Sequence, residues 1–280
     1  MSQLVLNGIA KNPVFIGGLM KSGTSLLRVL LGQHPLLYAS FETHWFTDDV
    51  RKKWHVTTSQ RMKLLLELFN LKNDEYINLC GIKNQEPDRE FIDIFLNYCA
   101  VKDSKERWIE KTPDNIKYWS LIKKQWKNPK FIHVTREYKD CYASWKSKRG
   151  DNLEEFLRRT INSYDDIKSI LGKNTTNYME IDYTELVFDT ENSIKKILEF
   201  IECPFNKNCL SLNLENTISE RKIIKNATGK DSSTSISLTK PIFNDSIGQW
   251  KSIVSDDEVK KIENTLSDYY RIFSQKWHYQ

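Results

Sequence analysis

Apolar and polar residues follow one another along the chain in a pattern that predicts strands and helices in turn. Short apolar runs predict buried strands, and segments with apolar residues three or four positions apart predict helices. The expected strands are Val14–Gly18, Leu37–Ala39, Arg107–Glu110, Lys130–Thr135 and Tyr178–Ile181. The expected helices are Ser22–Gln33, Arg61–Leu71, Arg89–Ala100, Asp140–Lys148, Leu153–Leu171, Glu191–Phe200 and Asp256–Phe273, the last capped near Ser255.

Strands that alternate with helices favour a parallel sheet flanked by helices. The segment Asn226–Thr239 is rich in Ser and Thr and has no apolar period, so we expect a loop there. No internal repeat and no Pro/Gly/Ser linker divides the chain, and α/β folds of 280 residues are often single. We therefore expect one α/β domain over residues 1–280.

Composition narrows the classes of function. Hydrophobic residues make up 39% of the chain and aromatic residues 12%, which is enough for a substantial core. The formal charge of +5 suits a protein that binds small anions, and no clustered basic stripe indicates a nucleic-acid partner. No apolar run approaches the roughly 20 residues of a membrane span, and the N-terminal segment is unlike a signal peptide. Five cysteines without a CxxC pair favour a reduced compartment, so we expect a cytoplasmic location.

The stretch GGLMKSGTSLLR, residues 17–28, connects the first expected strand to the first expected helix through a glycine turn. Such a loop directs backbone N–H groups and a helix N-terminus at an anion. Gly18 and Gly23 have the Walker A separation, but Thr24 follows Gly23 directly, and the lysine, Lys21, lies inside the loop. The side chains that add donors are those of Lys21, Ser22, Thr24 and Ser25.

Four motifs lie at the ends of expected strands or just after them. They are Gly17–Ser25, Glu42-Thr43, Glu110–Pro113 and the segment from Arg136 to Ser144. In a parallel α/β sheet, ligands bind beyond the carboxyl ends of the strands. We therefore expect these motifs to form one site.

Taken together, the motifs resemble those of the sulfotransferases that use 3′-phosphoadenosine 5′-phosphosulfate (PAPS). KSGTSLLR matches the loop that holds the 5′-phosphosulfate in that family, and VTREYKDCYASW matches the segment whose Arg and Ser, eight residues apart, hold the 3′-phosphate. YTELVFDTENSIKKILEFIECPF and SIGQWKSIVSDDEVKKIE resemble two further segments of the family. The resemblance runs from about Pro13 to about Glu263 and implies the P-loop, nucleoside-kinase-like fold of sulfotransferases.

Within that family the chain is most similar to the tyrosylprotein sulfotransferase branch. The branch's Arg-Ser-Gly-Thr-Thr, His-Pro and Glu-Glu-Thr segments correspond here to KSGTS, His34-Pro35 and Phe41-Glu42-Thr43. The branch's catalytic Glu corresponds to Glu42, whereas Lys21 stands where the branch has Arg and Phe41 where it has its first Glu. Lys240-Pro241 resembles a Lys-Pro stretch near the cofactor.

The resemblance implies a set of site residues and a reaction. Glu42 is the expected general base that takes the proton of the acceptor hydroxyl. Lys21 and Lys111 are expected to neutralise the charge that grows on the leaving phosphate. The expected cofactor-binding residues are Lys21, Ser22, Gly23, Thr24, Ser25, Arg136, Ser144, Tyr183 and Lys240. PAPS is the expected co-substrate and adenosine 3′,5′-bisphosphate (PAP) the product, with no metal site.

Several alternatives remain open at the level of the sequence. A small-molecule or nucleoside kinase has a similar first loop, and a nucleotide-binding scaffold would keep the fold without the chemistry. His44 is the second candidate for the base, although strand-like alternation would point it away from Glu42. We expect His133 in the core, while Tyr183 suits either the core or the cofactor.

The acceptor also remains open. A tyrosine in a peptide, a sugar hydroxyl and a small alcohol or amine are all compatible with the sequence, and it does not indicate the oligomeric state. We expect the acceptor pocket to be lined from Trp45–Leu71 and Leu153–Leu171. Its aromatic candidates are Trp45, Phe46, Trp54 and Phe156.

Overall fold

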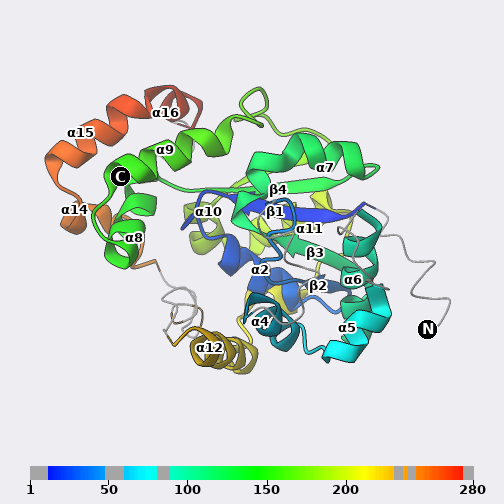
Figure 1. Ribbon diagram of the computed structural model, residues 1–280. Coiled ribbons are helices and arrows are strands. Elements are labelled where there is room, and N and C mark those ends of the chain that lie inside the picture. The colour runs from blue at the N-terminus through cyan, green and yellow to red at the C-terminus, as the bar shows by residue number, and fades with distance from the viewer. Residues whose placement is uncertain are drawn as a thin grey trace.

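A five-stranded parallel sheet forms the centre of the molecule (Figure 1). The computed structural model describes residues 12–47, 60–80, 89–229, 236, 238 and 244–273. The strands lie in the order β2-β3-β1-β4-β5 and all pair in parallel. Their bounds are β1 Val14–Gly18, β2 Leu37–Ala39, β3 Arg107–Lys111, β4 Lys130–Thr135 and β5 Tyr178–Asp182. All five predicted strands are present, with at most one residue added at an end.

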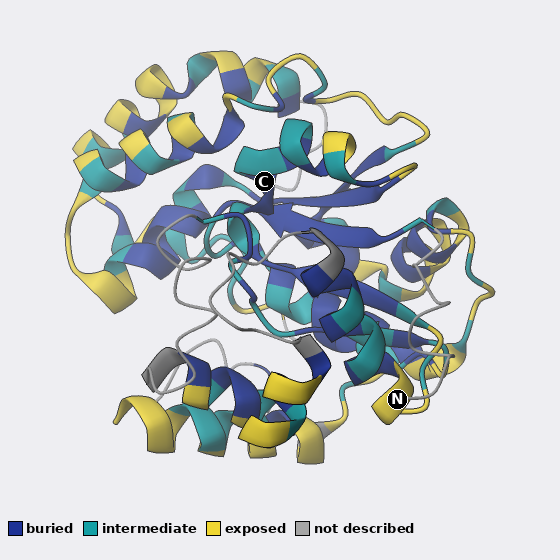
Figure 2. Cartoon of the chain, turned by 45° about the vertical axis from the view of Figure 1, so that its right-hand side comes forward, coloured by how far each residue is buried: buried dark blue, intermediate teal, exposed yellow. Residues whose placement is uncertain are grey.

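The helices lie on both faces of this sheet (Figures 1 and 2). Up to the end of β4 they are α2 Thr24–Gly32, α4 Gln60–Leu68, α5 Asn73–Cys80, α6 Arg89–Lys102 and α7 Trp119–Gln125, with the 3₁₀ helix η1 Pro113–Tyr118. After β4 come α8 Tyr138–Arg149, α9 Leu153–Tyr164, α10 Tyr183–Phe188, α11 Thr190–Phe200, η2 Lys207–Leu210 and α12 Leu214–Thr228. The chain continues with α14 Trp250–Ile253, α15 Asp256–Thr265 and α16 Ser267–Phe273.

The central strand β1 is buried on both faces because a parallel sheet is covered by helices on each side. Val14 and Ile16 belong to one hydrophobic cluster, together with leucines of α2 and isoleucines of α11. Phe15, which points to the opposite face, packs with Trp108 and Trp126 in the other cluster. This double burial fixes the carboxyl end of β1, where the glycine loop begins.

Two predicted helices differ most from the structure, one being much shorter and one divided, while α2 and α4 are shorter than predicted by up to three residues at an end. The helix from Leu153 ends at Tyr164, because Asp166 accepts a hydrogen bond from the Ser120 backbone N–H at 2.6 Å, in the first turn of α7. The predicted helix Asp256–Phe273 consists of α15 and α16, with Leu266 between them. Leu266 is itself fully buried, and the break allows both α15 and α16 to bring apolar residues to the core.

Among the described α-helices, five were not predicted, namely α5, α7, α10, α12 and α14. Helix α12 extends to Thr228 and so contradicts the first residues of the loop predicted at Asn226–Thr239. Most of that loop, from residue 230 onwards, lies outside the described residues. Among the described side chains of α12, only Thr217 is buried, which explains why the sequence has no apolar period there.

Candidate active site at the carboxyl ends of the strands

The loop between β1 and α2 has a backbone that few residues other than glycine adopt readily. Gly23 has φ +106°, and a Cβ atom there would lie 2.3 Å from a ring carbon of Tyr183. Lys21 also has a positive φ of 74° although it carries a side chain. In the described part of the chain, no side chain caps α2, so its first N–H groups remain available to an anion.

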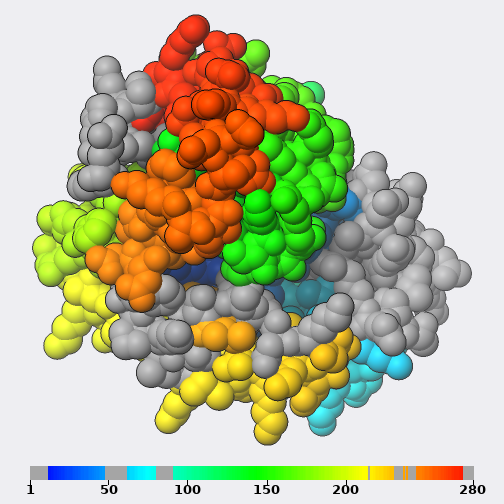
Figure 3. Space-filling model, turned by 90° about the vertical axis from the view of Figure 1, so that its left-hand side faces the viewer, coloured from blue at the N-terminus to red at the C-terminus, as the bar shows by residue number. Residues whose placement is uncertain are grey.

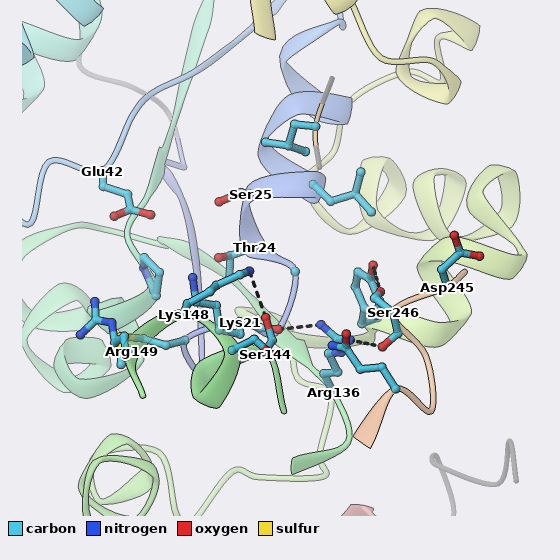
Figure 4. A pocket seen from close by; sticks show the side chains of 18 of the residues that line it. Lys21, Thr24, Ser25, Glu42, Arg136, Ser144, Lys148, Arg149, Asp245 and Ser246 are labelled. Carbon is cyan, nitrogen blue, oxygen red and sulfur yellow. Dashed lines mark hydrogen bonds between the residues drawn. The ribbon is translucent and has the colours of Figure 1, made fainter. Parts of the chain in front are cut away.

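A cavity of about 450 Å³ opens in front of this loop (Figure 4). We call it the polar cavity because four cationic side chains, those of Lys21, Arg136, Lys148 and Arg149, are among its lining residues. Most of its lining residues come from three helices and from loops, namely α2, α8, α10, the loops after β1 and β2, and Asp245 and Ser246. The predicted residues that line it are Lys21, Gly23, Thr24, Ser25, Glu42, Arg136, Ser144 and Tyr183. In Figure 3 the N-terminal part of the chain, in blue, is visible in the depth between the orange and green segments and α12.

Arg136 connects three parts of the polar cavity. It directly follows β4, and its Nη1 donates a hydrogen bond to the Lys21 carbonyl at 3.0 Å. Its Nη2 donates to the Ser246 carbonyl at 2.5 Å, and its guanidinium lies 4.4 Å from the Tyr183 ring centroid. The Nε atom of Arg136 and the hydroxyl of Ser22 are buried without a hydrogen-bond partner in the described structure. Buried donors of this kind suit an anionic ligand.

The sequence analysis missed Lys148 and Arg149, which bring two more cations to this cavity. Lys148 Nζ donates to Ser144 Oγ at 3.1 Å (Figure 4), because residues four apart share a helix face. Burial and the neighbouring charges of Lys21 and Arg136 lower the pKa of Lys148 to about 8. Burial and the charge of Arg149 lower the pKa of Lys21 as well. The spacing from Ser144 is the signal that could have identified Lys148.

Glu42 lies beside Lys111 and His44. Lys111 Nζ is 2.5 Å from Glu42 Oε1 and 3.3 Å from Ser25 Oγ, and its side chain is only 4% exposed. Burial opposes ionisation of Glu42, but the charge of Lys111 and the hydrogen bond with His44 outweigh it. The pKa of Glu42 therefore lies well below its usual range.

The expected orientation of His44 was wrong. His44 Nε2 lies 3.2 Å from Glu42 Oε2, so both side chains point to the same place. The reason is that residues two apart in an extended segment lie on the same face, so alternation by itself places His44 on the side of Glu42. His44 also has φ +50°, outside the extended region. His44 therefore contacts the candidate base instead of pointing away from it.

Glu110, which the sequence analysis noted only as a neighbour of Lys111, holds these groups in place. Its Oε1 accepts hydrogen bonds from the Thr43 N–H and hydroxyl at 3.2 and 2.7 Å, and from the Thr112 hydroxyl at 2.7 Å. Its Oε2 accepts from Asn115 Nδ2 at 2.5 Å. Glu110 is fully buried, and Thr43 and Thr112 directly follow Glu42 and Lys111 in the chain. The carboxylate thereby fixes the two backbone segments that carry Glu42 and Lys111.

A second cavity, of about 340 Å³, adjoins the first. We call it the α4–α12 cavity, because residues of these two helices form one part of its lining, while most of its other lining residues are polar or charged. Lys21, Ser25, Glu42 and Leu238 line both cavities. A group bound in one cavity can therefore meet a group bound in the other beside Glu42.

The two segments expected to line the acceptor pocket contribute differently to the α4–α12 cavity. Trp45–Leu71 contributes Leu64, Leu65 and Leu68 of α4, whereas Leu153–Leu171 contributes none of the described residues that line it. Trp45, Phe46 and Phe156 are buried in the core instead. Helix α12, which was not predicted, contacts α4 and contributes Thr217, Glu220 and Ile224 to the lining. Trp54 lies outside the described residues.

Three further expectations have different outcomes. His133 is fully buried and lies 2.7 Å from the Tyr178 hydroxyl, so the prediction of a core residue is confirmed. Tyr183 is mostly buried against Gly23 and also lines the polar cavity. It therefore packs as a core residue and also lies where a cofactor could bind, which are the two positions expected for it. Lys240 lies outside the described residues.

Comparison with known proteins identifies the family. Residues 13–207 match the model of the sulfotransferase family, and these residues make up more than half of the chain. The chain belongs to the sulfotransferase family. This match includes β1 to β5 and hence all the strand ends described above.

Curated relatives of this sulfotransferase are distant in sequence. A protein-tyrosine sulfotransferase of Drosophila melanogaster is 22% identical over 261 residues, which are 88% of this chain and 48% of that protein. Protein-tyrosine sulfotransferase A of Caenorhabditis elegans is also 22% identical, over 90% of this chain and 64% of its own length. The chain thus spans between about a half and two thirds of the length of these two relatives.

Solved structures support the same fold. The sulfotransferase domain of an olefin synthase from Synechococcus PCC 7002 matches with a TM-score of 0.63 at 20% identity, over 91% of this chain and 94% of that one. The sulfotransferase domain from the curacin biosynthetic pathway matches with a TM-score of 0.61 at 17% identity, over 92% and 98% of the two chains. The predicted sulfotransferase fold, with its central parallel sheet flanked by helices, is therefore confirmed.

The described residues contain neither a membrane-spanning helix nor a metal-binding group of side chains. None of the helices that the structure describes is long and apolar enough to cross a membrane. Within the same residues, no group of three or more His, Cys, Asp or Glu side chains is arranged to hold a metal ion.

Proposed function

We propose that this sulfotransferase moves the sulfuryl group of PAPS to a hydroxyl or amine acceptor, with Glu42 as the general base. The observation that carries the proposal is the position of the Glu42 carboxylate. It lies where the polar cavity and the α4–α12 cavity meet, within 2.5 Å of the Lys111 ammonium. A donor in the polar cavity and an acceptor in the α4–α12 cavity would react at this point.

The polar cavity suits PAPS because of its donors and its charge. Its lining has more basic than acidic side chains. The basic ones are Lys21, Arg136, Lys148 and Arg149, and the acidic ones are Glu42 and Asp245. Arg136 and Ser144 are the proposed contacts of the 3′-phosphate, while Lys21 and Ser22–Ser25 are those of the 5′-phosphosulfate. Tyr183 and Lys240 complete the proposed set of cofactor contacts.

PAPS supplies the sulfuryl group, and residues of this chain handle the proton and the charge. As the acceptor oxygen bonds to sulfur, Glu42 takes the proton of the acceptor, and the bond between sulfur and the 5′-phosphate oxygen breaks. Lys21 and Lys111 stabilise the negative charge on that oxygen, so a bridging metal ion is not required. Fixed donors at such a position are typically worth about 10²–10³ in rate.

We also propose a class of acceptor, a cellular location and the extent of the domain. The two animal relatives are named for tyrosine sulfation, which makes a phenol a reasonable first acceptor for this chain. Glycan and other small-molecule acceptors come next. We propose a cytoplasmic protein without a membrane span, whose residues 1–280 form one domain and whose partners do not include nucleic acid.

Transfer of labelled sulfate from PAPS tests the proposal directly. We expect transfer to a phenol mixture to continue in excess EDTA. PAP should also raise the melting temperature by several degrees, since a hundredfold excess over the dissociation constant adds about 2.7 kcal/mol. Turnover that instead requires ATP and Mg²⁺ would identify a kinase. Binding of PAP without transfer to any acceptor would favour a nucleotide-binding scaffold.

A further inference from the structure

An acidic side chain lies at one end of the polar cavity. Asp245 and Glu42 are the two carboxylates among the described residues that line it, beside four cations. In Figure 4 Glu42 lies on the left and Asp245 on the right, next to Ser246, so the two carboxylates belong to opposite ends of the cavity. Glu42 pairs with Lys111 and has a proposed role. Neither an ion pair nor a hydrogen bond joins the Asp245 carboxylate to another residue that the structure describes.

Contacts of the neighbouring residue hold Asp245 beside Arg136. The carbonyl of Ser246 accepts a hydrogen bond from Arg136 Nη2 at 2.5 Å, and its hydroxyl lies 3.0 Å from the hydroxyl of Tyr183. Arg136 follows β4 and Tyr183 begins α10, so two elements of the fold fix this point of the chain. Asp245 is therefore one residue away from a direct contact of the group that we assign to the 3′-phosphate.

A carboxylate beside a bound bisphosphate must face a part of the ligand that donates hydrogen bonds. When ionised it only accepts them, and it repels each phosphate group nearby. In PAPS and PAP the ribose carbon next to the 3′-phosphate carries the 2′-hydroxyl, whereas the amino group of adenine lies at the far side of the base. Dinucleotide-binding folds place an acidic residue on a free 2′-hydroxyl for the same reason. A carboxylate near Arg136 therefore suits the 2′-hydroxyl.

We propose that Asp245 determines nucleotide specificity by accepting a hydrogen bond from the ribose 2′-hydroxyl. The same charge rejects nucleotides that carry a phosphate at the 2′ position. This inference rests on the proposed function, because it places PAPS in the polar cavity with its 3′-phosphate at Arg136. It makes Asp245 a residue that selects the nucleotide and takes no part in sulfuryl transfer.

The 2′-deoxy analogue of PAP tests the hydrogen bond without turnover. By calorimetry, we expect the parent protein to bind PAP about tenfold more tightly than 2′-deoxyadenosine 3′,5′-bisphosphate, which is 1.4 kcal/mol. In Asp245→Ala the ratio of the two affinities should approach unity. Ratios are compared because loss of a negative charge favours every bisphosphate. A parent protein that ignores the 2′-hydroxyl, or a preference that persists in Asp245→Ala, contradicts the proposal.

The amino group of adenine is the other donor of the nucleoside. Inosine 3′,5′-bisphosphate has an oxo group in its place and keeps the 2′-hydroxyl. If Asp245 contacts the hydroxyl, the preference for PAP over the inosine nucleotide should be the same in the parent and in Asp245→Ala. A preference that disappears in the variant would place the adenine amino group at Asp245 and so refute the assignment.

Adenosine 2′,5′-bisphosphate tests the rejection of a 2′-phosphate. The parent should prefer PAP to this isomer, and the preference should fall about tenfold in Asp245→Asn, because the repelling charge is lost. Since Asn keeps an acceptor oxygen, part of the preference for the 2′-hydroxyl should remain. Asp257→Asn, at an exposed position in the first turn of α15, removes the same charge elsewhere and should leave every ratio unchanged. An equal preference in the parent and in Asp245→Asn would show that Asp245 does not reject the 2′-phosphate.

These measurements separate the inference from the proposed function. If PAP binds and labelled sulfate is transferred from PAPS while the ratios do not depend on Asp245, the function stands and the role of Asp245 is wrong. If PAP does not bind the parent protein, the proposed function fails, and the specificity proposed on it is overturned with it.

Discussion

Lys111 Nζ lies 2.5 Å from Glu42 Oε1, so the candidate base and a candidate cation of the site form one ion pair. His44 contacts the other oxygen of the same carboxylate at 3.2 Å. The pair keeps Glu42 ionised despite its surroundings and orients its carboxylate in the space between the two cavities. Lys111 in turn is held within reach of Ser25, in the first turn of α2.

Replacement of Glu42 should separate catalysis from nucleotide binding. Glu42→Gln keeps the shape of the side chain but cannot take a proton, so kcat should fall about 10²–10⁴-fold. The affinity for PAP should stay within about threefold of the parent value, or about 0.7 kcal/mol. Single-turnover transfer and calorimetry measure the two quantities, and Glu67→Gln on the exposed side of α4 is the control. Near-parental turnover of Glu42→Gln would instead favour His44 as the base.

Loss of Lys111 should change the pH dependence of the reaction. In the parent, the pKa of Glu42 lies well below its usual range, so the base remains deprotonated and active down to strongly acidic pH. In Lys111→Met the charge that lowers this pKa is absent while the effect of burial remains, so the pKa rises. Activity should then be lost at a higher pH as the medium is acidified, in addition to a drop of about 10²–10³ in kcat. The profile of kcat against pH between 4 and 8 measures both effects, and an unchanged acid limb would contradict the assignment.

The affinity for PAP should decrease as the pH rises through about 8. Lys148 has a pKa of about 8, so it is charged below that pH and loses its charge above it. The phosphate groups do not titrate in this range, because their second pKa is about 6. Binding near pH 8 should therefore take up a proton, which calorimetry in buffers of different ionisation enthalpy detects. Lys148→Arg should remove both the proton uptake and the decrease between pH 7.5 and 9.5. An affinity independent of pH in the parent would show that Lys148 does not contact the nucleotide.

Arg136 should distinguish PAP from AMP. Because its proposed contact is the 3′-phosphate, Arg136→Ala should weaken PAP binding by about 1.5–3 kcal/mol and leave the weaker binding of AMP nearly unchanged. The variant also loses the hydrogen bonds to the Lys21 and Ser246 carbonyls, so circular dichroism and the melting temperature must be measured alongside. An equal loss for the two nucleotides would mean that Arg136 only holds the loop in place.

Glu110 should affect both stability and catalysis. In Glu110→Gln the amide nitrogen cannot accept a hydrogen bond, so at least one of the four donors around this fully buried side chain loses its partner. The free energy of unfolding should fall by about 1–3 kcal/mol. We expect kcat to fall more than the affinity for PAP, because Thr43 adjoins Glu42. Thr43→Val removes the hydroxyl that donates to Glu110 and accepts from the Trp45 N–H, but leaves the other three donors to Glu110 in place, so kcat should fall less than in Glu110→Gln. Parental kcat in Glu110→Gln would refute this positioning role.

The sequence by itself determined the sheet and the order in which its strand ends carry the motifs. Buried strands such as Val14–Gly18 and Lys130–Thr135 are apolar runs whose signal is local, and the positions of Lys21 and Arg136 follow from them. Helix boundaries were less certain, because contacts such as that between Asp166 and α7 join segments far apart in the chain. The periodicity of apolar residues within one segment cannot predict such contacts.

Only the tertiary structure decided what surrounds the candidate base. The hydrogen bonds of Glu110 join Thr43 to Thr112, which lie 69 residues apart. In the same way Glu220 of α12 meets Arg28, 192 residues away. Pairings across such distances arise from the packing of the whole chain, so the sequence determined the motifs while the fold decided which side chains surround them.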